Sequence, residues 1–129
     1  MEYLFLVSRI LFGGYFIMNG VSHLKNIGGM AGYAASKGVP APKLAVAVTG
    51  LLLVLGGLGI VLGAWIQYAV LALVVFLVPV TFKMHQYWKE TDPMQKMGQQ
   101  INFTKNIALL GAVLAYLFIT LPWPLSLGM

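Results

Sequence analysis

The sequence predicts an all-α membrane protein, namely an antiparallel bundle of four transmembrane helices with short interfacial helices in two longer loops. Of the 129 residues, 60% are hydrophobic and 9% are charged, whereas about a quarter of a soluble domain is charged. The mean hydropathy is +0.87. Four apolar stretches also reach the length of about 20 residues that a helix needs to cross a bilayer. Because the length suits one domain, we expect residues 1–129 to form a single four-helix transmembrane domain.

Each span is set by where its apolar run begins and ends. The N-terminus lacks the basic segment of a cleaved signal peptide, so the first run predicts a retained helix. The second run contains no charge, and the third contains Pro79 and ends at His85. Because proline removes a backbone hydrogen bond, we expect a kink near that end of the third span. The predicted spans cover residues 3–23, 44–63, 65–85 and 102–121.

The two longer connections also contain helical patterns. In the first, the sequence predicts a short helix over residues 27–37, with Gly38 as its left-handed C-terminal cap. In the second, Thr91 or Asp92 can cap a helix that has Pro93 at its first position. That second helix can continue directly into the fourth span.

The distribution of basic residues predicts how the spans are oriented. Four antiparallel spans place both termini on one side of the membrane and the two longer loops on the other. Loops rich in lysine lie in the cytoplasm, so both longer loops are expected to be cytoplasmic and both termini outside. The lysines of these loops and their edges are Lys25, Lys37, Lys43, Lys83, Lys89, Lys96 and Lys105.

One set of polar side chains gathers at the cytoplasmic ends of the spans. Residues one helical turn apart share a face, and polar groups within a membrane helix usually face the bundle interior or a watery cavity. The sequence therefore predicts a ligand-binding site, with no catalytic role assigned to any member. Its residues are Asn19, His23, Thr81, His85, Lys105 and Asn106.

A purely structural interpretation of these residues also stands. Histidine and lysine at a helix end can snorkel to the headgroups, and Asn106 can cross-link helices by hydrogen bonding. Arg9 lies 14 residues before His23, about 21 Å along a helix, and so cannot join the cluster. Arg9 is either an outer-leaflet anchor or part of an anion or quinone site. As an anchor it could pair with the terminal carboxylate or with Glu2, Gln67 or Tyr68.

The residue types that are missing exclude several kinds of chemistry. The chain has no cysteine, which excludes disulfides, thiol redox chemistry and iron–sulfur ligation. No acidic residue lies within a predicted span, and two histidines without a carboxylate make a poor zinc site, so we expect no metal. A haem held by His23 and His85 is disfavoured because both lie near helix ends. The lysines are scattered, so the net charge of +5 does not indicate nucleic-acid binding.

Five blocks of the sequence resemble the DoxX family. They are GGYFIMNGVSHLKN, GMAGYAASKGVPAPKLAV, TGLLLVLGGLGIVLG, PVTFKMHQYW and FTKNIALLGAVL, and they cover nearly the whole chain. The resemblance implies a small four-helix protein of a prokaryotic cytoplasmic membrane, linked in some members to quinone-dependent oxidoreductase assemblies. Many members carry a glutamate where this chain has Leu53, so it resembles a branch that lacks this carboxylate. The family motif positions correspond to Arg9, His23, Pro79, His85, Lys105 and Asn106.

Three functions remain open at this point. The first is a quinone-binding membrane subunit of an oxidoreductase, whose electron carrier comes from a partner or a bound cofactor because the chain has none. The second is a structural or assembly subunit of a larger membrane complex or homo-oligomer, with glycines packing helices within or between chains. The third is a binder or carrier of a small anionic molecule, which a preformed cavity among the spans would support.

Overall fold

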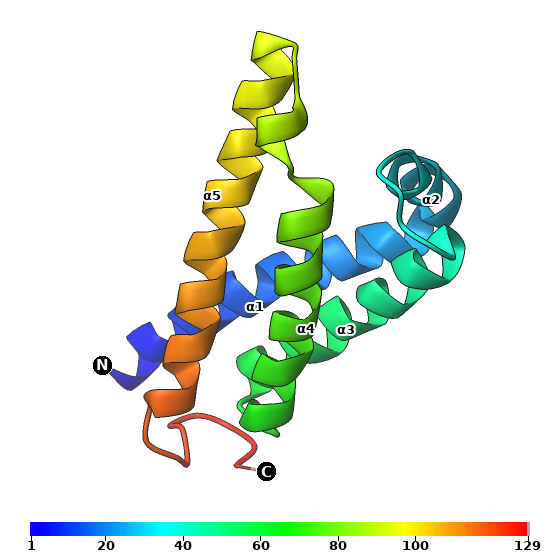
Figure 1. Cartoon of the computed structure of the whole chain (residues 1–129). Coiled ribbons are helices and arrows are strands. Elements are labelled where there is room, and N and C mark those ends of the chain that lie inside the picture. Colours follow the sequence, from blue (N-terminus) through cyan, green and yellow to red (C-terminus); the bar gives the residue numbers. More distant parts are fainter. Residues whose placement is uncertain (129) are drawn as a thin grey trace.

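Helices make up nearly all of the computed structural model, which describes residues 1–128 (Figure 1). No strand occurs within this described range, and four helices are long and apolar enough to cross a membrane. The elements are α1 (Glu2–Lys25), α2 (Ile27–Ser36), α3 (Pro42–Leu62), α4 (Ile66–Met84), η1 (Tyr87–Lys89), α5 (Pro93–Ala115) and η2 (Tyr116–Phe118).

The first three spans lie within a few residues of their predicted bounds, whereas the fourth differs. The helix predicted in the second loop and the fourth span form one continuous helix, α5, which begins at Pro93 and not at residue 102. Asp92 caps it, because the Asp92 Oδ2 atom accepts a hydrogen bond from the Gln95 backbone N–H at 3.0 Å. At its other end α5 stops at Ala115, before the predicted bound of 121, and tightens into the 3₁₀ turn η2.

The short helix α2 ends through backbone geometry that only glycine adopts easily. Gly38 has φ +81°, and its N–H donates to the Ala35 carbonyl at 3.0 Å. The Val39 N–H donates to the Ala34 carbonyl at 3.1 Å. This is the left-handed cap that the sequence predicts, although the helix stops at Ser36, one residue before the predicted bound.

The four long helices are arranged as two antiparallel pairs. Helix α1 packs along α3, α4 packs along α5, and contacts between α3 and α4 join the pairs. Figure 1 shows the α1–α3 pair crossing the α4–α5 pair at a wide angle. Both termini and the α3–α4 turn lie toward one end, while α2 and the α4–α5 connection lie away from it (Figure 1). The pairs therefore diverge toward the end that carries α2.

Glycines allow α1 to approach α3 closely. A Cβ atom added at Gly13 would lie 2.6 Å from the Gly57 carbonyl oxygen, and one at Gly57 would lie 2.6 Å from the Gly13 oxygen. The same contact recurs at Gly20, whose added Cβ atom would lie 2.7 Å from the Gly50 oxygen. These distances leave no room for a side chain, so Gly13, Gly20, Gly50 and Gly57 pack α1 against α3 within the chain.

A hydrophobic core fills the end at which the two pairs meet. It extends from Trp123 in the C-terminal tail, through Ile60 and Leu73, to Phe16 and Leu53. All five side chains are at most 3% exposed. Beyond Phe16 and Leu53 the pairs separate, and the core gives way to open space.

Candidate functional site

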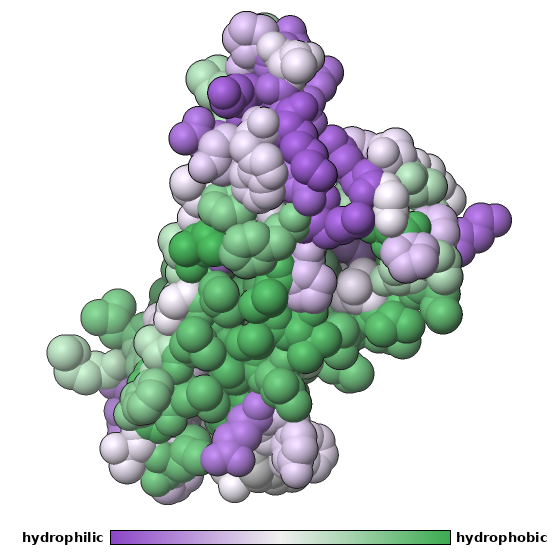
Figure 2. Space-filling view, in the orientation of Figure 1, coloured by the Kyte–Doolittle hydropathy of each residue, from purple (hydrophilic) through white to green (hydrophobic). Residues whose placement is uncertain are grey.

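A cavity of about 1060 Å³ lies between the two helix pairs, beyond the hydrophobic core. Side chains of α1, α2 and α3 form one wall, and side chains of α4 and α5 form the other. On the outside of the molecule, hydrophilic residues gather over the first half of α5 and the α4–α5 connection, above a broad hydrophobic surface (Figure 2). The cavity thus lies where the apolar body of the molecule meets its polar end.

The lining of the cavity is amphipathic. Its apolar part includes Phe16, Leu52, Leu53, Phe76 and Leu109. Its polar part contains no acidic residue among those that the structure describes, and it consists of Tyr15, Asn19, His23, Asn26, Tyr33, Thr49, Lys83, His85, Asn102, Lys105 and Asn106. A ligand that fits both parts has an apolar body and a polar head.

Five of the six residues predicted as a site line this cavity, and Thr81 does not. Thr81 is 2% exposed and lies within α4. The prediction paired Thr81 with His85 because residues four apart share a helix face. Helix α4 ends at Met84, however, and His85 follows it with φ −118° and ψ 51°. The turn relation is therefore broken, and His85 enters the cavity wall without Thr81.

His23 is held in one tautomer by its own helix. The His23 Nδ1 atom lies 2.8 Å from the Asn19 carbonyl oxygen. Because a carbonyl oxygen can only accept, Nδ1 carries the hydrogen and donates it. The ring also packs edge-on against Phe76, with centroids 5.9 Å apart. The Asn19 side chain is fixed in turn, since its Nδ2 donates to the Tyr15 carbonyl at 2.7 Å.

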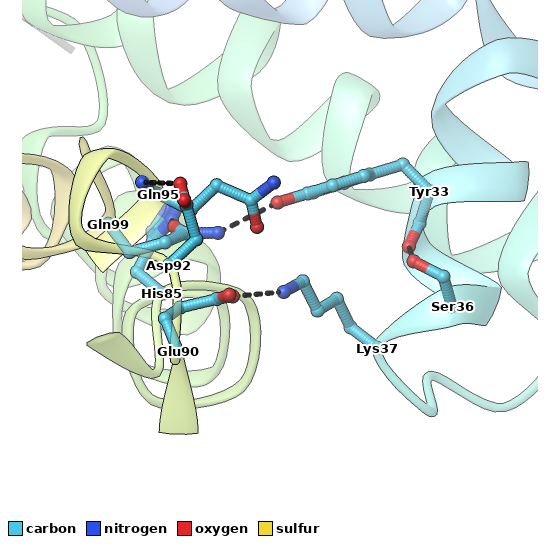
Figure 3. Close-up of polar contacts among 8 residues, drawn as sticks. All are labelled: Tyr33, Ser36, Lys37, His85, Glu90, Asp92, Gln95 and Gln99. Atoms are coloured by element: carbon cyan, nitrogen blue, oxygen red, sulfur yellow. Dashed lines mark hydrogen bonds and ion pairs between the residues drawn. The ribbon is translucent and has the colours of Figure 1, made fainter. Parts of the chain in front are cut away.

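A chain of hydrogen bonds joins His85 to α2 across the cavity mouth. The His85 Nδ1 atom lies 2.8 Å from Gln99 Oε1, and Gln99 Nε2 donates to the Tyr33 hydroxyl at 2.8 Å. Figure 3 shows Tyr33 of α2, and Lys37 directly after this helix, reaching toward His85, Gln99 and Glu90. Lys37 and Glu90 form an ion pair with Nζ and Oε1 2.9 Å apart. We call these five residues the latch.

The ion pair of the latch is half-buried, with side chains 25% and 17% exposed. The hydrogen bond from Lys37 to Glu90 raises the pKa of Lys37 above its ordinary value. A raised pKa means that, with the Glu90 side chain as a carboxylate, the charged lysine stabilises the fold below the unfolded pKa of lysine. That contribution is lost only as the pH rises through the higher folded value, so the pair is intact at neutral pH.

Sequence patterns reveal only part of the latch. Lys37 and Glu90 are 53 residues apart, and no pattern links them. Gln99 was not predicted, although one signal for it exists. Polar residues recur on α5 at Gln99, Asn102 and Asn106, which is the three-and-four spacing of one helix face.

Two lysines line the cavity without an ion-pair partner in the described part of the chain. The Lys105 Nζ atom lies 5.7 Å from the centre of the Tyr15 ring, a cation–π contact between α5 and α1. The Lys83 amine lies beside Gly38, because a Cβ atom added there would be 3.4 Å from Nζ. Both amines therefore remain free to donate to a ligand.

Arg9 lies outside this site and is fully buried, with 0% of its side chain exposed. Its guanidinium stacks 5.5 Å from the Trp123 ring centre. An anchor in the headgroup region would be exposed, so that interpretation is wrong. Within the described residues Arg9 does not bond Glu2, Gln67 or Tyr68, and the terminal carboxylate proposed from the sequence lies outside those residues. Four backbone carbonyls at 2.7–3.3 Å accept from Arg9, those of Ile60, Val61, Pro124 and Leu125.

Comparison with known proteins identifies a family and one relative that are similar to this chain. The DoxX family model matches residues 4–86, which contain nearly all of α1, the whole of α2 to α4 and both histidines. The chain is also similar to the inner membrane protein YphA of Escherichia coli (strain K12). The two are 32% identical over 125 residues, covering 96% of this chain and 87% of YphA. No solved structure matches the chain.

Proposed function

The chain belongs to the DoxX family of integral membrane proteins, and from this premise we propose that it is a membrane subunit that binds a quinone-class ligand for an oxidoreductase. The cavity between the helix pairs carries the proposal. Its volume of about 1060 Å³ is slightly above the range of about 300–1,000 Å³ for small-molecule sites. A close-packed bundle would leave no such space.

The lining suits a quinone in both of its parts. The apolar stretch along Phe16, Leu52 and Phe76 suits an isoprenoid tail, which partitions from the bilayer by apolar burial. At the polar end, Lys105 and Asn106 supply N–H donors for ring oxygens. The chain has no cysteine, so a partner protein or a bound cofactor supplies the electron transfer. The ligand-binding role is thus the part that this chain performs.

A binding assay tests this function. Purified protein in nanodiscs is titrated with a quinone that carries a short isoprenoid tail, and we expect saturable binding. Lys105→Met combined with Asn106→Leu removes the donors and should weaken binding about tenfold, the effect of losing one or two net hydrogen bonds. Thr104→Val is the matched control, because Thr104 is exposed and bonds only its own helix at 2.9 and 3.1 Å. If no quinone binds saturably, the proposed function fails.

The alternative function is a purely structural subunit. Its main support was the set of glycines that could pack against other chains, and the structure gives most of these glycines a partner within this chain. Gly14 has no neighbour within 4 Å, whereas Gly56 and Gly59 of α3 face α4. Added Cβ atoms at these two positions would lie 2.8 Å from Leu73 and 2.5 Å from Ala69. Under this alternative, His23→Gln and His85→Gln would leave assembly and activity unchanged.

We also propose the sidedness of the protein. The cavity mouth and the latch face the cytoplasm, α2 lies at the interface, and the helices pack as a bundle in the inner membrane with both termini outside. The lysine-rich connections support this orientation, and YphA is described as an inner membrane protein. Single cysteines at Tyr3 and Lys96 in this cysteine-free chain, treated with an impermeant maleimide on intact cells, test it. Labelling of Lys96→Cys but not Tyr3→Cys would contradict it.

A further inference from the structure

The two histidines of the cavity offer the same atom to a ligand. The His23 Nδ1–H donates a hydrogen bond to the Asn19 carbonyl oxygen, with Nδ1 and the oxygen 2.8 Å apart. A neutral imidazole carries one hydrogen only, so the His23 Nε2 atom is a bare acceptor. The tautomer of His23 is assigned from a backbone carbonyl oxygen, which can only accept a hydrogen bond.

The latch fixes His85 in the same way. Gln99 donates its Nε2 hydrogen to the Tyr33 hydroxyl, and so Gln99 turns its Oε1 atom toward His85 Nδ1. An amide oxygen accepts, and His85 therefore donates from Nδ1 and keeps Nε2 bare. Gln99 is thus a positioning residue that sets the tautomer of His85.

Both Nε2 atoms are open to a ligand. Neither Nε2 atom has a hydrogen-bond partner among residues 1–128. Within that range the only fully buried side-chain nitrogen or oxygen without a partner is Trp123 Nε1, so both histidine Nε2 atoms are accessible. The open space that both rings line is the cavity. Its polar end therefore contains two acceptors from histidine beside the donors of Lys83 and Lys105.

From this pairing of acceptors and donors we propose that the cavity prefers the hydroxyl-bearing, reduced form of its ligand, a hydroquinone, over the quinone. The inference rests on the proposed function and narrows its ligand. A quinone oxygen only accepts, so it bonds the lysines but leaves a histidine Nε2 facing another acceptor. A hydroxyl donates to Nε2 and still accepts from a lysine, which satisfies both.

The lysines alone cannot create this preference. The oxygen of either form accepts a hydrogen bond from an ammonium group, so Lys83 and Lys105 favour neither strongly. Only the histidine acceptors separate the two forms. Removing them should therefore abolish the preference while leaving some binding of both forms.

The test compares three ligands that share one isoprenoid tail: the hydroquinone, its dimethyl ether and the quinone. Binding is measured anaerobically in nanodiscs at about pH 8.5. We expect the hydroquinone to bind about three- to tenfold more tightly than the quinone, the gain of one net hydrogen bond. The dimethyl ether keeps the shape but has no donor, and it should lose that advantage.

Two variants and one control locate the cause. His23→Phe keeps an aromatic ring against Phe76 without the acceptor, and Gln99→Met releases His85 without altering a histidine. Each should reduce the preference for the hydroquinone while quinone binding, which reports folding, persists. Thr104→Val should leave the preference unchanged.

The outcomes separate the two proposals. If none of the three ligands binds the unaltered protein, the proposed function itself fails. If the quinone binds as tightly as the hydroquinone, or if both variants retain the preference, only the inference about the reduced form is overturned.

Discussion

Arg9 carries a charge into the apolar part of α1 and finds there a set of backbone carbonyls instead of a carboxylate. Two acceptors, the carbonyls of Ile60 and Val61, come from the last turns of α3. The other two come from Pro124 and Leu125 in the C-terminal tail. We call this arrangement the clasp. It fixes the tail, with Trp123 packed in the core, against the end of α3.

Removing the guanidinium should loosen this end of the molecule. Arg9→Met leaves buried carbonyls without a donor, and we expect a loss of about 3 kcal/mol or more in the free energy of unfolding. SDS titration of purified protein measures it, and protease cleavage after Trp123 should become faster. Arg9→Lys keeps one donor group in place of three nitrogens, so its free energy of unfolding should lie between those of the natural chain and Arg9→Met. An Arg9→Met protein within about 0.5 kcal/mol of the natural chain would show that the clasp contributes little.

At the scale of single residues, the sequence predicts which side chains line the cavity better than it predicts their hydrogen-bond partners. Asn19 and His23 share a face because both lie inside a regular helix, and both line the cavity. Thr81 fails the same rule because α4 stops one residue before His85. The partners of Arg9 could not be predicted, since backbone carbonyls leave no trace in the side-chain pattern. Gln99 and Tyr33 meet across 66 residues, which depends on how whole helices are placed.

Helix α3 is the central element of the fold because it packs glycine faces against two neighbours. Gly50 and Gly57 face α1, and Gly56 and Gly59 face α4. Its apolar length made this span predictable from composition alone. Which glycine meets which helix was not predictable, because a helix with glycines on several faces can pack in several rotations. For α5 the sequence predicts the capped start at Asp92, but it does not decide whether that helix continues into the fourth span.

Two adjacent glycines of α1 provide a matched test of this packing. An added Cβ atom at Gly13 would lie 2.6 Å from the Gly57 oxygen, whereas one at Gly14 has nothing within 4 Å. We expect Gly13→Ala to destabilise the protein by about 1–3 kcal/mol through overpacking. Gly14→Ala should be neutral or stabilise by up to about 1 kcal/mol through helix propensity. Unfolding free energies measured side by side check both. Equal effects at the two positions would mean that α1 and α3 are not in close contact.

Across the whole molecule, the latch joins the two helix pairs where they diverge. Both pairs are anchored at the opposite end by the hydrophobic core. The cavity between them is therefore bounded by a rigid apolar base and by a polar closure of only a few side-chain contacts. Composition and hydropathy predict four helices, but they do not predict that the pairs separate. The separation depends on long-range packing, which no local pattern specifies.

Cross-linking tests whether the latch holds the pairs together in the membrane. In this cysteine-free chain, Lys37→Cys and Glu90→Cys replace an ion pair of 2.9 Å and should be joined by a short bismaleimide. We expect one intramolecular product on a denaturing gel, together with slower quinone association. Lys37→Cys with Tyr68→Cys is the control, because Tyr68 lies near the start of α4, at its opposite end, and it should give no such product. An absence of product from the first pair would show that α2 stands away from the α4–α5 connection.

The clasp also links the order of synthesis to the finished fold. Arg9 leaves the ribosome early, whereas Pro124 and Leu125 follow 115 and 116 residues later. Until they arrive, a nascent chain in the translocon carries a guanidinium that lacks half of its acceptors, at a depth where lipid supplies none. The clasp can therefore close around Arg9 only after residues 124 and 125 have been synthesised.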